Sequence, residues 1–340
     1  MLHSVDMEPL DILAVGDIVT EPFIRLSDAE VYEKNECSML GMRFGDKIPY
    51  ESATPVPAVG NASNAAVAAA RLGLSSALRA YIGADAQGKE CMDRLEQEGV
   101  LTEYMVTEDD KQTNHHFVLW YGNERTILVK HEAYAYDVPT LNERPKWMYL
   151  SSLADNSLPY HHALADLLNQ YPDIKLAFQP GTFQMELGTD ALKEVYARTD
   201  FFVVNVEEAE RILKTPPHEK RKPEDIKALI QGLAALGPKI ICITDGTNGA
   251  YAYDGSRYMR VPMYPDSRGP FERTGAGDAF ASTIVAALAL GEPLEKALLW
   301  GPINSMAVVQ EVGAQKGLLS REELLSYLEK APADYSITDF

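Results

Sequence analysis

The sequence contains few cysteines, no long apolar run and no obvious targeting segment. Its three cysteines, Cys37, Cys91 and Cys242, are odd in number and far apart, which argues against a disulfide framework or a zinc site. No apolar stretch approaches the length needed to cross a bilayer, and residues 1–9 lack the basic-then-apolar pattern of a signal peptide. We therefore expect a soluble protein in a reducing cytoplasm.

Basic residues are also fewer than acidic ones. The chain has 31 Lys and Arg and 50 Asp and Glu, so its formal net charge is -19. A surface of this sign argues against nucleic-acid and membrane binding, since both partners are anionic. A small anionic substrate is still compatible, because a local site can be positive. With 340 residues, 46% of them hydrophobic, the chain can bury a substantial core.

Short apolar strand patterns alternate with helical patterns along nearly the whole chain. This alternation predicts an α/β protein with a mostly parallel central sheet that is covered by helices on both faces. Two stretches depart from the alternation, at about 18–57 and 112–132, and both have strand or hairpin character. The first stretch could form strands of a small sheet, and the second is typical of a hairpin.

The most informative stretch is 272–280, where two glycines flank an alanine and an acid follows at once. An Ala- and Leu-rich run comes next, so Gly275–Gly277 should lie in the turn that opens a helix. Amide groups there lack intrahelical partners and can hold an anion. Asp278 would repel that anion, so it is better suited to remove a proton from a hydroxyl during phosphoryl transfer. The plainer alternative is an acid that only caps a buried helix.

Other polar groups follow predicted strands or open predicted helices. Asp17 ends the first strand, where ligands of open α/β sheets bind, although such an acid is often only a turn residue. Asn205 ends a later strand, and Glu208 lies three residues further on the same helical face, which is also the spacing of a capping pair. The segment 60–64 opens an Ala-rich helix and offers amides that could pair with a diol or cap the helix.

Taken in order, these segments resemble the PfkB/ribokinase family of carbohydrate and nucleoside kinases. The stretch 272–278 is similar to its D-T-x-G-A-G-D motif, with Glu272 and Arg273 replacing Asp and Thr. The resemblance implies a ribokinase-like three-layer α/β/α sandwich, with residues 1–340 as one kinase domain and the two strand-rich stretches as a β-sheet lid. A homodimer through that lid is also implied.

The resemblance further implies a role for each matching residue. Asp278 would be the general base, with Gly275, Ala276 and Gly277 as the anion hole. The acceptor would be held by Asp17, Gly60, Asn61, Asn64 and Arg125. ATP would be held by Asn205, Thr244, Gly246, Gly249 and Asn304, and Mg²⁺ by Glu208 and Asn205 through water, with K⁺ as a possible further ion.

The sequence leaves the acceptor open. A small sugar is the first expectation, and a nucleoside is the alternative with the same mechanism. A non-catalytic sugar or nucleotide sensor is the alternative from another class. Where many relatives carry D-x-N-x-R, this chain has Gln179, Gly181 and Phe183 at the three positions, so the acceptor cannot be assigned by motif.

Overall fold

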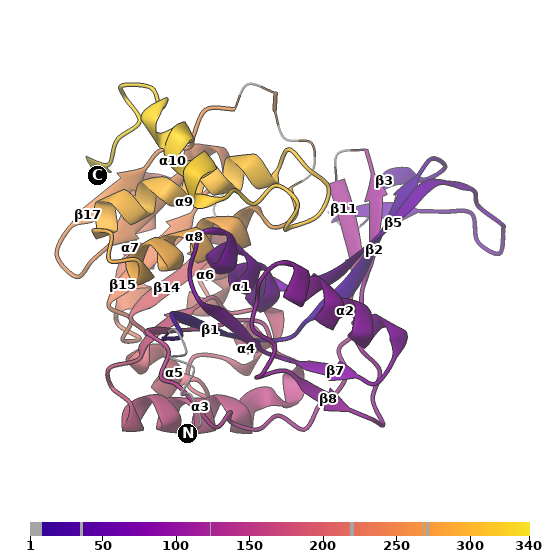
Figure 1. Ribbon diagram of the computed structural model, residues 1–340. Helices are drawn as coiled ribbons and strands as arrows, with labels where there is room; N and C mark the ends of the chain where they lie inside the picture. Colours follow the sequence, from indigo (N-terminus) through magenta and orange to yellow (C-terminus); the bar gives the residue numbers. More distant parts are fainter. Residues whose placement is uncertain are drawn as a thin grey trace, which may run out of the picture.

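The computed structural model describes residues 9–34, 37–122, 124–217, 221–266, 268–269, 271 and 273–340. Within these residues the largest sheet has nine strands, in the order β18-β17-β16-β15-β14-β13-β12-β1-β6 (Figure 1). Its strands are β1 (Ile12–Val15), β6 (Ser76–Arg79), β12 (Trp147–Leu150), β13 (Lys175–Phe178), β14 (Phe201–Asn205), β15 (Ile240–Thr244), β16 (Ala250–Tyr253), β17 (Tyr258–Val261) and β18 (Thr338–Asp339).

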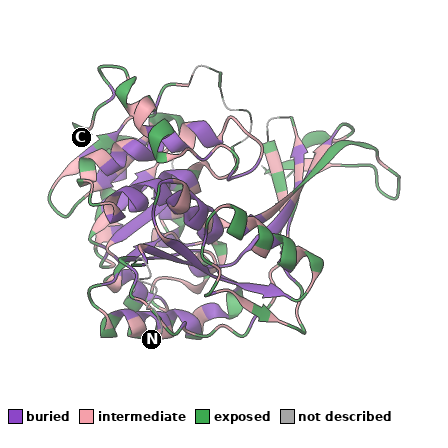
Figure 2. Cartoon of the chain, viewed as in Figure 1, coloured by how far each residue is buried: buried purple, intermediate pink, exposed green. Residues whose placement is uncertain are grey.

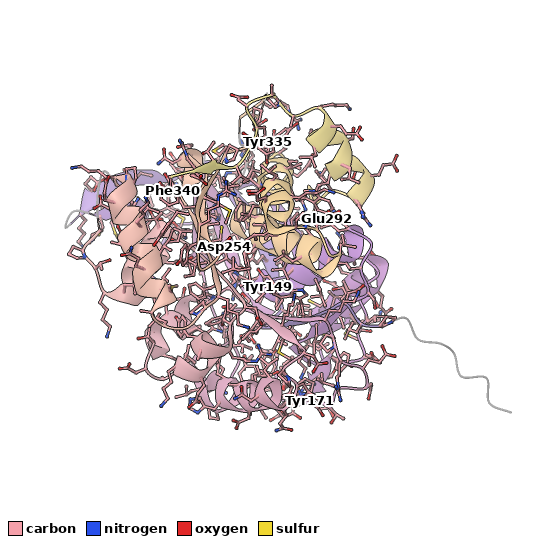
Figure 3. All side chains as sticks on the ribbon, turned by 90° about the vertical axis from the view of Figure 1, so that its left-hand side faces the viewer. Tyr149, Tyr171, Asp254, Glu292, Tyr335 and Phe340 are labelled. Atoms are coloured by element: carbon pink, nitrogen blue, oxygen red, sulfur yellow. The ribbon has the colours of Figure 1, made fainter. Side chains whose placement is uncertain are left out.

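The strands from β6 to β15 pair in parallel, and β16, β17 and β18 add an antiparallel end. Phe340, labelled in Figure 3, lies at that end. It packs on Tyr251 and Tyr258, with ring centroids 4.8 and 5.9 Å away. The mostly parallel sheet predicted from the alternating pattern is confirmed. Strand order reverses beside β1, and in such sheets the ligand crevice forms at that point.

Helices cover both faces of the large sheet. One face carries α1 (Asn61–Arg71), α2 (Ala86–Gln97), α8 (Ala276–Ala289), α9 (Leu294–Val308) and α10 (Arg321–Glu329). The other carries α3 (Leu158–Gln170), α4 (Thr182–Leu187), α5 (Lys193–Arg198), α6 (Val206–Leu213) and α7 (Pro223–Ala234), and two 3₁₀ turns, η1 (Asp155–Ser157) and η2 (Gly246–Asn248), lie in connections.

Strand β1 shows why both faces must be covered. All four of its residues are apolar and buried, with Ile12 and Ala14 in the core on one face and Leu13 and Val15 in the core on the other. A strand that alternated apolar and polar residues could leave one face in water, but this one cannot. The three-layer α/β/α arrangement follows from this pattern.

A five-stranded small sheet projects from the body (Figure 1). Among the described residues it comprises β2 (Val19–Leu26), β5 (Tyr50–Val59), β9 (Asn114–His115), β10 (Phe117–Tyr121) and β11 (Glu124–Leu128). Two-stranded pairs are β3 (Glu30–Lys34) with β4 (Cys37–Gly41), and β7 (Tyr81–Gly83) with β8 (Val106–Glu108). Figure 2 shows that burial decreases toward the far end of the projection.

No helix in the described part of the chain is both long and apolar enough to cross a membrane.

Candidate functional site

The turn before α8 requires glycine at one position. Gly275 has φ +80°, a left-handed conformation that side chains disfavour, and a Cβ there would lie 2.6 Å from the Cα of Ala314. Helix α8 then begins at Ala276, which places Asp278 in its first turn. The predicted helix opening is therefore present, and tight packing beneath the turn explains its glycine.

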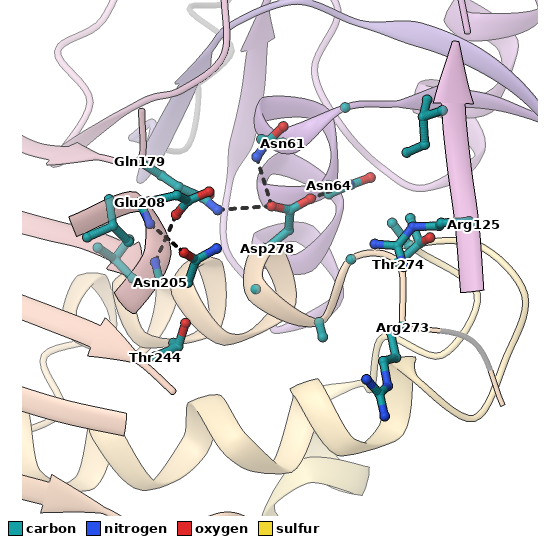
Figure 4. Close-up of a pocket in the computed structure, with 18 of the residues that line it drawn as sticks. Asn61, Asn64, Arg125, Gln179, Asn205, Glu208, Thr244, Arg273, Thr274 and Asp278 are labelled. Carbon is teal, nitrogen blue, oxygen red and sulfur yellow. Dashed lines mark hydrogen bonds between the residues drawn. The ribbon is translucent and has the colours of Figure 1, made fainter. Parts of the chain in front are cut away.

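Three side-chain amides converge on the carboxylate of Asp278 (Figure 4). Asn61 Nδ2 and Gln179 Nε2 each donate to Oδ1 at 3.0 Å, and Asn64 Nδ2 donates to Oδ2 at 2.8 Å. Burial raises the pKa of Asp278, while the donors on Asn64 and Gln179 oppose that rise. The result is a buried carboxylate with a fixed orientation and an enhanced proton affinity, which suits a general base.

Gln179 is a site residue that the sequence did not assign. It follows β13, and the Tyr149 hydroxyl donates a hydrogen bond to Gln179 Oε1, which leaves Nε2 aimed at Asp278. Burial holds the pKa of Tyr149 well above its usual value, so this hydroxyl stays a donor. The sequence could have indicated Gln179 because it directly follows a predicted strand, as several of the other candidate residues do.

The amides before Asp278 are only partly engaged. Ala276 N donates to Arg273 O over a long 3.4 Å. Among the described residues no acceptor is recorded for Gly277 N, and a Cβ built on Gly277 would meet open space. Gly275 N likewise has no acceptor among the described residues, so the Gly275 and Gly277 amides are the better placed of the three predicted donors to receive an anion.

The first of two adjacent cavities, of about 290 Å³, holds this carboxylate and these amides. Its charged lining residues are Glu21, Glu208, Asp278, Arg125 and Arg273. Its other lining residues include Gly60, Asn61, Asn64, Gln179, Asn205, Thr244, Thr274, Gly275, Ala276, Gly277 and Ala314. Eleven predicted positions thus surround one space: Gly60, Asn61, Asn64, Arg125, Asn205, Glu208, Thr244, Gly275, Ala276, Gly277 and Asp278.

The second cavity, of about 340 Å³, is lined mainly by apolar side chains such as Met263, Phe280 and Met306. Predicted residues Gly246 and Gly249 also line it. The two cavities share Thr244, Arg273, Ala276 and Gly277. A ligand with a flat apolar end and a polar tail could therefore occupy both, with its tail reaching Asp278.

Asn205 and Glu208 form a reciprocal capping pair at the start of α6. Asn205 Oδ1 accepts from Glu208 N, and Glu208 Oε2 accepts from Asn205 N, both at 2.8 Å. Burial raises the pKa of Glu208, and the nearby Asp278 contributes to the rise. Within the described residues no three acids, histidines or cysteines are close enough to hold a metal alone. These two side chains suit Mg²⁺ bound largely by water and ligand oxygens.

Asp17 lies beside the first cavity but is not among its lining residues. Its carboxylate is buried, with Oδ1 accepting from the Tyr136 hydroxyl at 2.8 Å and Oδ2 lying 2.7 Å from His131 Nδ1. The ring of Phe183 meets His131 edge-on at 5.3 Å. Asp17 is therefore held by His131 and Tyr136, and neither Asp17 nor His131 lines the first cavity.

Asn304 lies away from both cavities. Its side chain is fully buried in α9, where Nδ2 donates to Thr283 Oγ1 and Oδ1 accepts from Leu319 N. The same helix instead lines the second cavity through Pro302, Ser305, Met306 and Val309. Their spacing marks one helical face, and Asn304 lies on another.

Arg125 comes from β11 of the small sheet and lines the first cavity together with Ile127, two residues on. Alternate strand residues share a face, which is why this pair points the same way. Glu272, on which the expectation of a K⁺ site depends, lies outside the described residues.

Comparison with known proteins identifies the family and the fold of this chain. The model of the pfkB family of carbohydrate kinases matches residues 40–321. The ribokinase of Bacillus subtilis strain 168 is 29% identical over 313 residues, covering 85% of this chain and 97% of that protein.

Two solved structures share the fold. The Arabidopsis thaliana ribokinase complexed with ribose and ATP has a TM-score of 0.78 at 19% identity, covering 95% of this chain and 99% of that one. The Methanocaldococcus jannaschii nucleoside kinase has a TM-score of 0.75 at 20% identity, covering 94% and 98%. With the family match spanning most of the sequence, this chain belongs to the pfkB family of carbohydrate kinases and has the ribokinase-like fold.

Proposed function

We propose that this kinase transfers the γ-phosphoryl of ATP to a hydroxyl of a small sugar, with Asp278 as the general base. The observation that carries the proposal is that Asp278 lines the first cavity next to Gly277, whose backbone lies where the two cavities join. The apolar second cavity suits the base of ATP, and the polar first cavity suits phosphates and an acceptor alcohol.

In this mechanism the acceptor hydroxyl gives its proton to Asp278, and its oxygen attacks the γ-phosphorus. The bond from that phosphorus to the bridging oxygen breaks, and ADP leaves. The amides of Gly275, Ala276 and Gly277 stabilise charge on the transferred group, and those of Gly275 and Gly277 contribute most because neither N–H has an acceptor among the described residues. Asn61, Asn64 and Gln179 hold the carboxylate in a fixed orientation in which it can accept this proton.

The remaining predicted residues surround that reaction. Gly60, Asn61, Asn64 and Arg125 are proposed to contact the acceptor, with Asp17 acting beside His131. Thr244, Gly246 and Gly249 are proposed to hold ATP. Asn205 and Glu208 would hold Mg²⁺ through water, and the ion would neutralise phosphate charge.

A nucleoside is the second candidate for the acceptor. It is favoured by the aromatic pair Phe183 and His131 beside Asp17, which could stack on a base. The nucleoside kinase among the structural neighbours supports the fold but not the substrate. The sensor alternative is disfavoured because the base and its three amide donors are all in place.

The test measures ADP release with ATP, Mg²⁺ and a panel of acceptors: ribose, fructose, 2-keto-3-deoxygluconate, adenosine, cytidine and inosine. We expect turnover with one class, and Asp278→Asn should lower kcat by about 10²–10⁴-fold while keeping ATP binding. Asp109→Asn, an exposed acid outside both cavities, is the control. No release with any acceptor would favour the sensor, and near-normal turnover of Asp278→Asn would remove it from the base role.

We also propose that the chain is one kinase domain whose small sheet acts as the lid of the acceptor site. Next to that sheet, β3, β4 and the segment that leads into and begins β5 expose apolar side chains, namely Val31, Tyr32, Met39, Met42, Phe44 and Tyr50. A second copy that covers this face would give a homodimer. Sedimentation analysis should show a dimer that Phe44→Ser weakens, and a monomer at all concentrations would contradict this.

The proposal places the enzyme in the cytoplasm and includes activation by K⁺. Two of its three described cysteines are buried and none is paired, as suits a reducing compartment. Replacing K⁺ with a bulky organic cation in the assay should lower turnover, and equal rates would exclude the ion. Removing Mg²⁺ with a chelator should abolish turnover.

A further inference from the structure

Arg273 occupies a position that the proposed mechanism does not use. Of the four residues shared by the two cavities, Thr244, Arg273, Ala276 and Gly277, it alone carries a charge. Any ligand with its base in the second cavity and its reacting end at Asp278 must pass these four residues. The polyphosphate of the donor would cross at Arg273.

The negative charges around the junction favour a cation there. Asp266 and Arg273 are the charged residues among the described lining of the second cavity, so Arg273 is its single cation. The first cavity contains three carboxylates, on Glu21, Glu208 and Asp278, against two arginines. A phosphate chain entering this field is repelled unless a positive group faces it.

The side chain of Arg273 is available for such a contact. It is 61% exposed, and its recorded partner is Glu124 at the tip of the small sheet, with Nη1 and Oε1 3.8 Å apart. Glu124 is 75% exposed, and an ion pair so open to water is weak and easily exchanged. A guanidinium can instead bind phosphate oxygens through two parallel hydrogen bonds.

The backbone of Arg273 is tied to the anion-binding turn, because its carbonyl accepts from Ala276 N. Figure 4 shows its side chain extending from this turn away from Asp278. The guanidinium therefore does not neutralise the base. Its place on the donor side, next to the amides, fits contact with the phosphates of ATP.

We propose that Arg273 is a catalytic residue that binds the donor phosphates at the junction of the two cavities, exchanging Glu124 for the phosphate chain when ATP binds. This inference rests on the proposed function. Arg273 stabilises the charge that develops on the phosphate oxygens as the bond to the γ-phosphorus breaks. Once Arg273 no longer contacts Glu124, the tip of the small sheet is free to close over the acceptor.

The test compares Arg273→Ala and Arg273→Lys with the parent, using calorimetric binding of ATP and of adenosine, and kcat. Arg273→Ala should weaken ATP binding about 10- to 100-fold, leave adenosine binding unchanged and lower kcat about 10²–10³-fold. Arg273→Lys should recover part of the loss, because it keeps the charge without the paired hydrogen bonds. Added guanidinium should partly restore Arg273→Ala.

Two controls separate the contact from a general effect on structure. Glu124→Gln removes the competing carboxylate, so its ATP affinity should equal or exceed that of the parent. Arg321→Ala removes an exposed arginine that lines neither cavity and should change nothing.

Unchanged ATP affinity in Arg273→Ala would overturn the inference, as would equal weakening of ATP and adenosine, which would mean that the residue only shapes the pocket. The binding measurement requires no acceptor. A parent that binds ATP but phosphorylates nothing would therefore refute the proposed function, and the ATP comparison would still decide the role of Arg273.

Discussion

Replacing Gln179 tests how the structure controls the base. Gln179→Leu keeps roughly the same side-chain size and removes one of the three donors on Asp278. Oδ1 then retains only Asn61, and the Tyr149 hydroxyl loses its acceptor. Asn64 on Oδ2 is untouched, so the carboxylate should remain in place.

The magnitude follows from the kind of hydrogen bond that is lost. A hydrogen bond to a charged group contributes about 1.5–3 kcal/mol, and ~1.4 kcal/mol corresponds to tenfold in proton affinity. Loss of the donor disfavours the ionised form of Asp278, whose pKa burial already raises. The active form is the deprotonated one, so activity is lost as the pH falls through that pKa. The acid limb of the kcat profile should therefore move to higher pH.

The assay is kcat against pH for the parent, Gln179→Leu and Gln179→Glu. The loss in Gln179→Leu should be large at acid pH, roughly 10- to 100-fold, and should shrink toward alkaline pH. Gln179→Glu should be more impaired near neutral pH, because a second carboxylate beside Asp278 favours shared protonation. Thermal unfolding of each variant checks the fold, and Gln231→Leu, at an exposed position of α7, is the matched control.

The result that refutes the reasoning is equally specific. A loss in Gln179→Leu that is the same at every pH would mean that Gln179 acts through packing. A profile like that of the parent would mean that Gln179 does not position the base at all. A milder effect for Gln179→Glu than for Gln179→Leu would contradict the electrostatic account.

Three further predictions follow. Gly275→Ala should lose turnover and destabilise the protein in thermal unfolding, because its φ of +80° and the nearby Ala314 exclude a Cβ; parent-like activity would contradict this. The free energy of unfolding should fall as the pH drops from about 6.5 toward 4, by ~3 kcal/mol, because burial lowers the pKa of His161 to about 4 and only the unfolded chain binds that proton; denaturant titrations of His161→Gln should lack this dependence. Glu208→Gln should raise the Mg²⁺ concentration needed for half-maximal turnover about tenfold, and an unchanged requirement would remove Glu208 from the metal site.

Local sequence pattern was sufficient to predict the parallel sheet, the start of α8 and the capped start of α6. The alternation of apolar strands and helices indicated the parallel sheet, and the glycine pair before an Ala-rich run indicated where α8 opens. Asn205 and Glu208 adopt the capping geometry that their spacing predicts. Each of these features depends on residues a few positions apart, so neighbouring side chains and backbone propensity decide it.

Most of the residues predicted from the family resemblance line one cavity, but the resemblance did not predict the hydrogen bonds that they make. Ser305 lines the second cavity and Asn304 does not, because of how α9 is rotated about its axis relative to the sheet. The engagement of Asp17 by His131 and Tyr136 joins positions more than a hundred residues apart.

What the sequence by itself determined is therefore the parallel sheet, its helices and the turn that opens α8. Only the tertiary structure brings Asn61, Asn64 and Gln179 to Asp278, from 217, 214 and 99 residues away in the chain. The physical reason is that the carboxyl ends of parallel strands all lie at one edge of the sheet. Which side chains then form hydrogen bonds there depends on how segments distant in the sequence pack together.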